Sequence, residues 1–372
     1  MRLFSKCLIL VCLLFVAGCG DRSFTPVVPE AVNVGKPITV FAGSSRLPET
    51  NGNFGFQRSE RLRHLETVVT VPPSHELGDL RFGYANPNPE RQFTLAAQSE
   101  FESPDAFKAR LRAALAELPP DRREITVFVH GYNSTQSEAI FRAAQLKHDI
   151  QVPVLLLTYS WPSRGRALPY AYDTDRILFA RVGMAQLLRQ VTDVGADRVL
   201  VVAHSMGGAV TMETLRQMDL KSPGWAARAL SSIVLISPDL DVDVFRSQMA
   251  RLSGLPNPFV IFVSRRDGIL RLSSRIRGTS PDNRLGSIDD IERIMDLPIE
   301  VIDATAFADN AGSPHFIAAT SPALISMIRQ ARAVSEMFDT DETSLAAVLT
   351  GRPQSQNRAQ EFEITQRGLF ER

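Results

Sequence analysis

The amino-acid sequence predicts an α/β fold with a mostly parallel central sheet and helices on both of its faces. Short apolar runs without alternation, rich in β-branched residues, are typical of strands that are buried on both faces. Stretches with apolar residues three and four positions apart separate these runs, and strands that alternate with helices form parallel sheets. The runs are ITVFVH (125–130), VLLLTYS (154–160), VLVVAHS (199–205), SIVLIS (232–237), PFVIFVS (258–264) and IEVID (299–303).

The other elements follow from capping and spacing. Ser103 and Ser321 are each followed by a proline, and a serine N-cap before a proline at the first helical position begins a helix. The remaining expected elements are helices over 139–150 and 177–191 and strands over 38–43, 67–72 and 91–97, with a loop between the first two strands.

The start of the chain resembles an export signal. Two basic residues precede an apolar run over 8–17, which is too short to cross a bilayer as a helix. The run ends in Gly18-Cys19, which resembles the lipobox of bacterial lipoproteins, where the cysteine is acylated and becomes the mature N-terminus. We therefore expect a signal peptide over 1–18, a lipid on Cys19 and attachment to the inner or outer membrane of the bacterial cell envelope. An ordinary signal peptide with an incidental cysteine is the alternative.

Composition and length bound the rest of the organisation. We expect a tether over 19–36, one α/β domain over 37–338 and a polar tail over 339–372. With 41 Lys+Arg and 41 Asp+Glu in 372 residues, the chain lacks the basic excess that nucleic-acid binding requires. The six histidines show no metal-ligand spacing, so we expect neither a metal nor a cofactor. The oligomeric state stays open.

A candidate nucleophile lies in VLVVAHSMGGAV (199–210), where a buried strand runs into a serine and then into a helical pattern. Ser205 has small residues two positions before and after it, Ala203 and Gly207. This pattern resembles a nucleophile elbow, the sharp strand-to-helix turn that projects a reactive serine. A turn serine in an ordinary strand-helix connection is the alternative.

A serine hydroxyl needs a base that takes its proton and an acid that orients this base. His315 is the one histidine after Ser205 in the sequence, and the chain order in such folds is serine, acid, histidine. Asp267, after the strand at 258–264, is the expected acid, and Asp239 is the second candidate. A helix-capping or ion-paired carboxylate is the alternative for Asp267. His204, next to the serine on the strand, is expected to be structural.

The oxyanion of such a reaction needs preorganised hydrogen-bond donors. The strand at 125–130 runs into His130-Gly131-Tyr132-Asn133, which resembles the His-Gly loop that supplies one donor. By that resemblance, the backbone N–H groups of Tyr132 and Met206 would bind the oxyanion. In the alternative interpretation, Gly131 makes a turn and His130 makes a core hydrogen bond.

Together these segments resemble the α/β hydrolases, and more narrowly a bacterial family of hydrolase-like proteins catalogued as domain of unknown function nine hundred. The resemblance covers roughly residues 38–330 and implies a serine hydrolase fold with Ser205, Asp267 and His315 in the triad roles. It implies no substrate. It is carried by VTVPPSHELGDL (69–80), VFVHGYN (127–133), SWPSRG (160–165), YAYD (170–173), AHSMGG (203–208), SPDLDVDVF (237–245), SRRDGILRLS (264–273) and RLG (284–286).

The predicted function is a membrane-tethered, esterase-like or lipase-like serine hydrolase that cleaves a small-molecule or lipid ester through an acyl-enzyme. Trp161 and Tyr170 are compatible with acyl-chain binding, but packing is their expected role. Two alternatives stay open: a non-catalytic lipoprotein that uses the same scaffold to bind a partner, and an acyltransferase that passes the acyl group to a hydroxyl acceptor instead of water.

Overall fold

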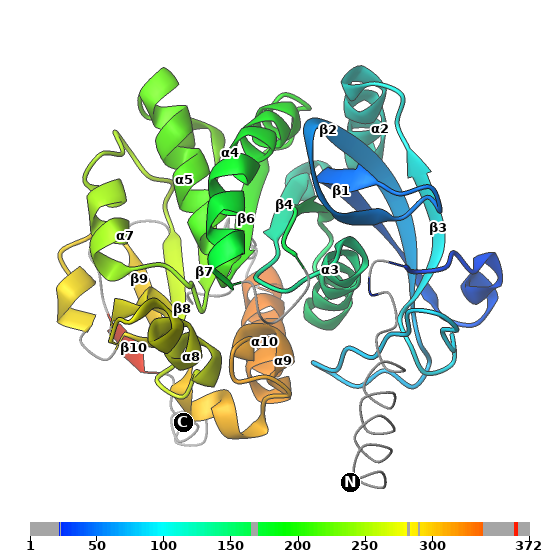
Figure 1. The fold of residues 1–372 in the computed structure, drawn as a ribbon. Helices are drawn as coiled ribbons and strands as arrows, with labels where there is room; N and C mark the ends of the chain where they lie inside the picture. The colour runs from blue at the N-terminus through cyan, green and yellow to red at the C-terminus, as the bar shows by residue number, and fades with distance from the viewer. Residues whose placement is uncertain are drawn as a thin grey trace, which may run out of the picture.

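The computed structural model describes residues 22, 24–164, 170–280, 283–288, 291–337 and 361–363. The expected signal peptide, the expected lipid site at Cys19 and most of the expected tail lie outside the described residues. In the described part, ten strands form one sheet, and helices lie on both of its faces (Figure 1). The strand order is β10-β9-β8-β7-β6-β4-β5-β1-β2-β3.

The six strands predicted from continuous apolar runs are confirmed, and they pair in parallel. Parallel strands direct all their carboxyl ends to one edge of the sheet, where the loops that follow them meet. These strands are β4 (Glu124–Val129), β5 (Leu155–Ser160), β6 (Arg198–His204), β7 (Ser232–Ile236), β8 (Phe259–Val263) and β9 (Glu300–Asp303).

The first two strands are longer than expected, and the third begins at residue 94 instead of 91. β1 (Lys36–Pro48) and β2 (Phe54–Val71) form an antiparallel hairpin that β3 (Thr94–Glu100) extends, so the predicted loop between residues 43 and 67 is wrong. Much of the first half of β2 is polar and exposed, and such a segment lacks the apolar run on which the prediction depended. β10 (Glu361–Glu363), inside the expected tail, pairs with β9, and no strand was predicted there.

The helices predicted after Ser103 and Ser321 begin at the prolines that follow these serines, whereas the helices expected from residues 139 and 177 begin earlier, at Gln136 and Tyr170. Ser103 accepts a hydrogen bond from the backbone N–H of Ala106 at 3.1 Å, and Thr135 and Glu138 form a reciprocal capping box at the start of α3. The helices are α2 (Pro104–Ala116), α3 (Gln136–Ile150), α4 (Tyr170–Thr192), α5 (Met206–Lys221), α6 (Trp225–Ala229), α7 (Val242–Met249), α8 (Gly268–Arg277), α9 (Ile317–Thr320) and α10 (Pro322–Met337), with 3₁₀ turns η1 (Pro29–Asn33), η2 (Pro120–Arg122), η4 (Leu285–Ser287), η5 (Ile291–Ile294) and η6 (Thr305–Asn310).

Each face of the sheet has its own apolar core. Residues of α2, α4, α5 and α7 pack on one face, and residues of α3 and α10 pack on the other. Trp161 is fully buried in the first core, as its expected packing role requires, whereas nothing is described of the Tyr170 side chain. Burial on both faces explains why the central strands are continuously apolar.

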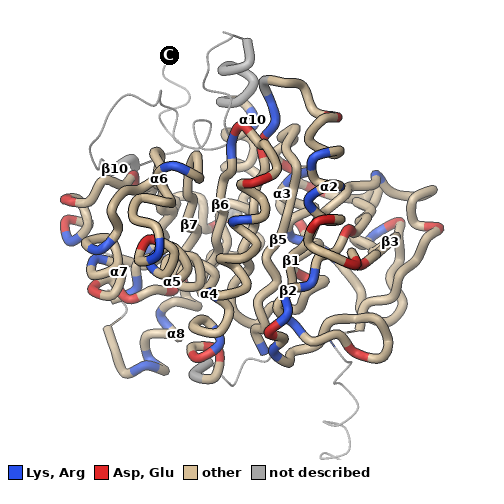
Figure 2. The backbone as a smooth tube through the Cα atoms, turned by 90° about the horizontal axis from the view of Figure 1, so that it is seen from above, with Lys and Arg blue, Asp and Glu red and all other residues tan. Residues whose placement is uncertain are grey.

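Charges are distributed over the whole molecule. Basic and acidic residues are interspersed along the chain in Figure 2. Among the described helices, none combines the length and the apolar character that a bilayer crossing requires.

Candidate active site

Ser205 lies in the turn between β6 and α5. Its backbone φ is 53°, a positive value that residues with a β-carbon rarely adopt. A β-carbon at Gly207 would lie 2.5 Å from the carbonyl oxygen of Val129 and 2.6 Å from that of His130, so glycine is required there. The turn therefore has the strained strand-to-helix geometry expected of a nucleophile elbow.

Three predicted side chains from distant segments meet at this turn. Nε2 of His315 lies 2.9 Å from Oγ of Ser205, and Nδ1 of His315 lies 2.7 Å from Oδ2 of Asp267. Ser205 follows β6, Asp267 follows β8, and His315 lies between η6 and α9. The arrangement is a continuous hydrogen-bonded chain from a hydroxyl through an imidazole to a carboxylate.

Asp267 has a second set of partners. Its Oδ1 accepts hydrogen bonds from the backbone N–H groups of Ile269 and Leu270, each at 3.0 Å, and so caps the start of α8. The helix-capping alternative is therefore also true of this residue, because the two carboxylate oxygens serve different donors. The side chain is fully buried.

Asp239, the second candidate for the acid, has other partners. Its carboxylate accepts a hydrogen bond from Oγ of Ser273 at 2.9 Å and lies 3.7 Å from Nε of Arg284. Asp267 is thus the member of the pair that contacts His315.

The loop His130–Ser134, which we call the His130 loop, lies against the N-terminus of α5. The close approach of Gly207 to the carbonyl oxygens of Val129 and His130 brings the two segments together. Tyr132 is in this loop, and Met206 is the first residue of α5, where a backbone N–H has no partner within the helix. Both proposed oxyanion donors therefore belong to segments that border Ser205.

The two histidines beside the nucleophile stay neutral. Burial, followed by repulsion from Arg46, lowers the pKa of His130 to about 3, and burial together with His315 holds the pKa of His204 well below its ordinary value. His204 donates from Nε2 to the backbone oxygen of His315 at 3.0 Å, and its ring stacks on Phe316 at 3.9 Å. It therefore supports the position of His315.

Arg46 of β1 holds the His130 loop from within the protein, and nothing in the sequence pattern indicated this. The side chain is fully buried, and burial lowers the pKa of Arg46 to about 9. Its guanidinium donates to the backbone oxygen of Ser134 at 2.7 Å, to that of Ser163 at 3.1 Å and to Oγ of Ser160 at 2.8 Å. Nη2 also lies 3.4 Å from Nε2 of His130.

Arg22 binds the same loop from the N-terminal segment. It donates to Oδ1 and to the backbone oxygen of Asn133 at 2.8 and 3.0 Å and forms an ion pair with Glu138 at 2.7 Å. Asn133 has a φ of 56°, a left-handed conformation that asparagine tolerates. Arg22 is three residues after Cys19, the expected lipid site, in the sequence.

A cavity of about 240 Å³ borders the site on the side of α3. Its wall is mixed, because the lining residues include the apolar Phe82 and Phe316 as well as the charged Glu138 and Arg142. A β-carbon at Gly131 would lie 2.9 Å from that of Ser205. Gly131, which lines the cavity and has no side chain, therefore lies between the cavity and Ser205.

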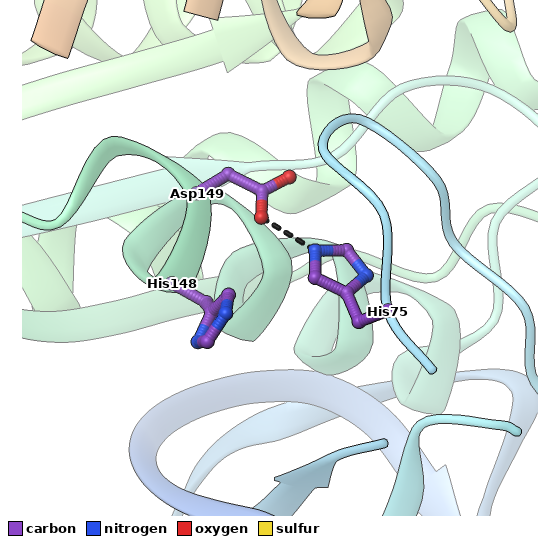
Figure 3. A group of neighbouring side chains, drawn as sticks. All are labelled: His75, His148 and Asp149. Carbon is purple, nitrogen blue, oxygen red and sulfur yellow. Dashed lines mark hydrogen bonds and ion pairs between the residues drawn. The ribbon is translucent and has the colours of Figure 1, made fainter. Parts of the chain in front are cut away.

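A second group of titratable side chains lies at the far end of α3 and was not predicted. His75, His148 and Asp149 are neighbours (Figure 3). Oδ1 of Asp149 lies 2.5 Å from Nε2 of His75, while Oδ2 accepts from the backbone N–H of Gly78 at 2.8 Å and from Nε2 of Gln145 at 2.5 Å. Both carboxylate oxygens are committed to protein donors, so the group fits a structural link between α3 and residues 75–78 better than a metal site.

Solved structures that resemble this chain include esterases and a lipase. Lipase B of Aspergillus fumigatus matches with a TM-score of 0.35 and 12% identity over 59% of this chain and 56% of the lipase, so the chain spans little more than half of that protein. Esterase 2 of Thermogutta terrifontis matches with a TM-score of 0.29 and 13% identity over 65% of this chain and 79% of the esterase. The Pyrobaculum calidifontis esterase matches with a TM-score of 0.33 and 10% identity over 87% of this chain and 88% of the esterase.

No curated protein matches the sequence. A family model described as an α/β hydrolase of unknown function (DUF900) matches residues 103–332, more than half of the chain, and the protein therefore belongs to this family of α/β hydrolases.

Proposed function

We propose that this protein is a serine hydrolase that cleaves an ester through an acyl-enzyme. The observation that carries the proposal is the chain of hydrogen bonds from Ser205 through His315 to Asp267, at 2.9 and 2.7 Å. These distances lie within the reach required for direct proton transfer and for orienting the base.

In the first half-reaction, Nε2 of His315 takes the proton of the Ser205 hydroxyl as Oγ bonds to the carbonyl carbon of the ester. Asp267 accepts a hydrogen bond from Nδ1 and stabilises the imidazolium that forms. The backbone N–H groups of Tyr132 and Met206 bind the negative charge that develops on the carbonyl oxygen. His315 then gives its proton to the departing alkoxide, which leaves the acyl group on Ser205.

In the second half-reaction, His315 takes a proton from a water molecule, whose oxygen bonds to the acyl carbon. Collapse of the second tetrahedral intermediate breaks the bond to Oγ, and the proton returns from His315 to Ser205. The carboxylic acid is released. An acyltransferase would differ in this step alone, with an alcohol in place of water.

The ester is a lipid or another substrate at a membrane surface. Cys19 carries the lipid that attaches the protein to a membrane of the bacterial cell envelope, and Arg22 fixes the chain three residues later on the His130 loop. Three residues span at most about 10 Å when fully extended. Such a short connection would keep the active site close to the membrane.

A fluorophosphonate probe tests the reaction, because it reacts with an activated serine. We expect the purified full chain to be labelled and Ser205→Ala to remain unlabelled. The control is Ser231→Ala, directly before the start of β7 and so at the edge of the sheet opposite Ser205, and it should be labelled like the wild type. Labelling that survives in Ser205→Ala would contradict the mechanism, and an unlabelled wild type would favour the non-catalytic alternative. Metabolic incorporation of palmitate, lost in Cys19→Ala, tests the anchor.

A further inference from the structure

Helix α8 exposes an apolar stripe to solvent. Ile269, Leu272 and Ile276 are 51%, 52% and 54% exposed, and their spacing of three and four residues places them on one side of the helix. Leu270, Ser273 and Ser274 of the same helix are buried. Three neighbouring aliphatic side chains that are exposed on a helix mark a surface to which a membrane or another molecule binds.

The same segment is strongly basic. Five arginines lie within residues 265–277, and the one acidic residue among them, Asp267, is buried. Arg265 and Arg266 form ion pairs with Asp303 and Asp309. The exposed arginines of the segment are Arg265, Arg266, Arg271, Arg275 and Arg277.

Two of these arginines lie beside the apolar stripe without a counterion. On the α-helical repeat, Arg271 and Arg275 project about 60–160° away from the three aliphatic residues, on the exposed side. Neither forms an ion pair with a carboxylate in the parts of the chain that the structure describes. An apolar stripe next to unneutralised arginines is the pattern of helices that lie in the interface of an anionic bilayer.

The position of α8 relates this pattern to the site. α8 begins directly after Asp267, and β8, which precedes it, is parallel to β4, which precedes the His130 loop. The carboxyl ends of β4 and β8 lie at the same edge of the sheet (Figure 1). Arg22 at the His130 loop and the start of α8 therefore lie at the edge that carries Ser205.

We propose that α8 is a membrane-binding surface that takes anionic lipid headgroups, with its aliphatic stripe inserted at the headgroup boundary. Together with the lipid on Cys19, this surface turns the edge that holds Ser205 toward the bilayer. The inference rests on the proposed function and narrows its substrate to lipid esters presented by an anionic membrane. Acyl attachment at one end of a protein leaves its orientation free, and a second contact fixes it.

Vesicle sedimentation tests the surface without the lipid anchor. The protein is the chain from residue 20 onward, which retains every described residue, and the vesicles contain phosphatidylcholine alone or with 30% phosphatidylglycerol. We expect binding to the anionic vesicles, weakened by salt, and at least about tenfold weaker binding for the triple variant Ile269→Ser, Leu272→Ser, Ile276→Ser. Arg271→Gln with Arg275→Gln should also weaken binding to anionic vesicles, by about threefold or more.

The chain offers a matched control. Leu178 and Val182 of α4 are each 49% exposed, and we expect Leu178→Ser with Val182→Ser to bind vesicles like the unchanged protein. Equal binding by the α8 variants and the unchanged protein would overturn the proposal, and so would equal loss in the α4 control or indifference to phosphatidylglycerol. A concentration-dependent dimer that the α8 triple variant abolishes would assign the stripe to a second copy of the chain instead.

Fluorophosphonate labelling separates this proposal from the proposed function. The α8 variants should be labelled at Ser205 and should hydrolyse a short soluble ester within about twofold of the unchanged protein. Labelling with no vesicle binding would reject the membrane surface and keep the hydrolase. Vesicle binding without labelling would reject the hydrolase and keep the membrane surface.

Discussion

Helices α3 and α8 both begin beside the candidate active site, but they direct their apolar residues in opposite ways. In α3, Ile140, Phe141, Ala143 and Ala144 are buried, and the helix completes the core on one face of the sheet. In α8, Leu270 is the buried aliphatic residue, while three others face solvent. The difference shows that one helix at this edge serves folding, and the other has surface that folding does not use.

The difference between α3 and α8 predicts the largest effect on stability when a single aliphatic side chain of each helix is shortened. Ile140→Ala leaves a cavity in a packed core and should lower the free energy of unfolding by about 3 kcal/mol. Ile269→Ala removes a side chain that is half exposed and should change it by less than about 0.5 kcal/mol. Urea unfolding of both variants checks this, and similar losses in the two would remove the distinction between the helices.

Acid should destabilise the α3 side of the molecule, because His130 precedes this helix and is buried in the neutral form. Its pKa is about 3 in the folded protein and near 6.5 in an unfolded chain. The unfolded state therefore binds more protons between these values, and stability that is complete above pH 6.5 is lost as the pH falls toward 3. One such group lowers the free energy of unfolding by about 2 kcal/mol between pH 6.5 and 5.

Urea unfolding at pH 7 and pH 5 measures this loss, and His130→Gln is the matched variant. The glutamine cannot take up the proton, so the difference between the two pH values should shrink by about 2 kcal/mol even if the variant is less stable at both. An unchanged difference would mean that other groups determine the acid sensitivity.

A smaller loss than that of His130 is expected for the contact between the N-terminal segment and the start of α3. Arg22 is one-third exposed in its ion pair with Glu138, and such pairs contribute little to stability. Arg22→Gln should lower the free energy of unfolding by about 0.5 kcal/mol, and high salt should reduce the difference further. A loss above about 2 kcal/mol would show that this contact belongs to the core fold, contrary to the role of a tether between the lipid and the fold.

The parallel half of the sheet could be predicted from the sequence because its strands are buried on both faces. Such strands are continuously apolar, and β4 to β9 all carry this signal. The first half of β2 carries none, because Gln57, Arg58, Glu60 and Arg61 in it are polar and at most partly buried. It pairs with β1 through backbone hydrogen bonds, and the spacing of apolar residues does not reveal such bonds.

The three side chains of the candidate relay could be predicted because chain order and strand ends restrict the choice. Their supports could not, because Arg46 contacts residues about 90 to 120 positions away along the chain, and a single arginine in a strand has no period. Helix α8 was missed for a related reason. Its exposed aliphatic residues outnumber its buried one, so apolar spacing does not point to the core, although five arginines around GIL were a visible signal.

The two roles of Asp267 limit how this region can be altered. One oxygen caps α8 and the other holds His315, so the helix start and the imidazole orientation share a single rotamer. An extra methylene, as in glutamate, would displace both oxygens at once. Any transplant of the relay onto another scaffold must therefore carry the first turn of this helix with it, because the carboxylate alone would be free to rotate.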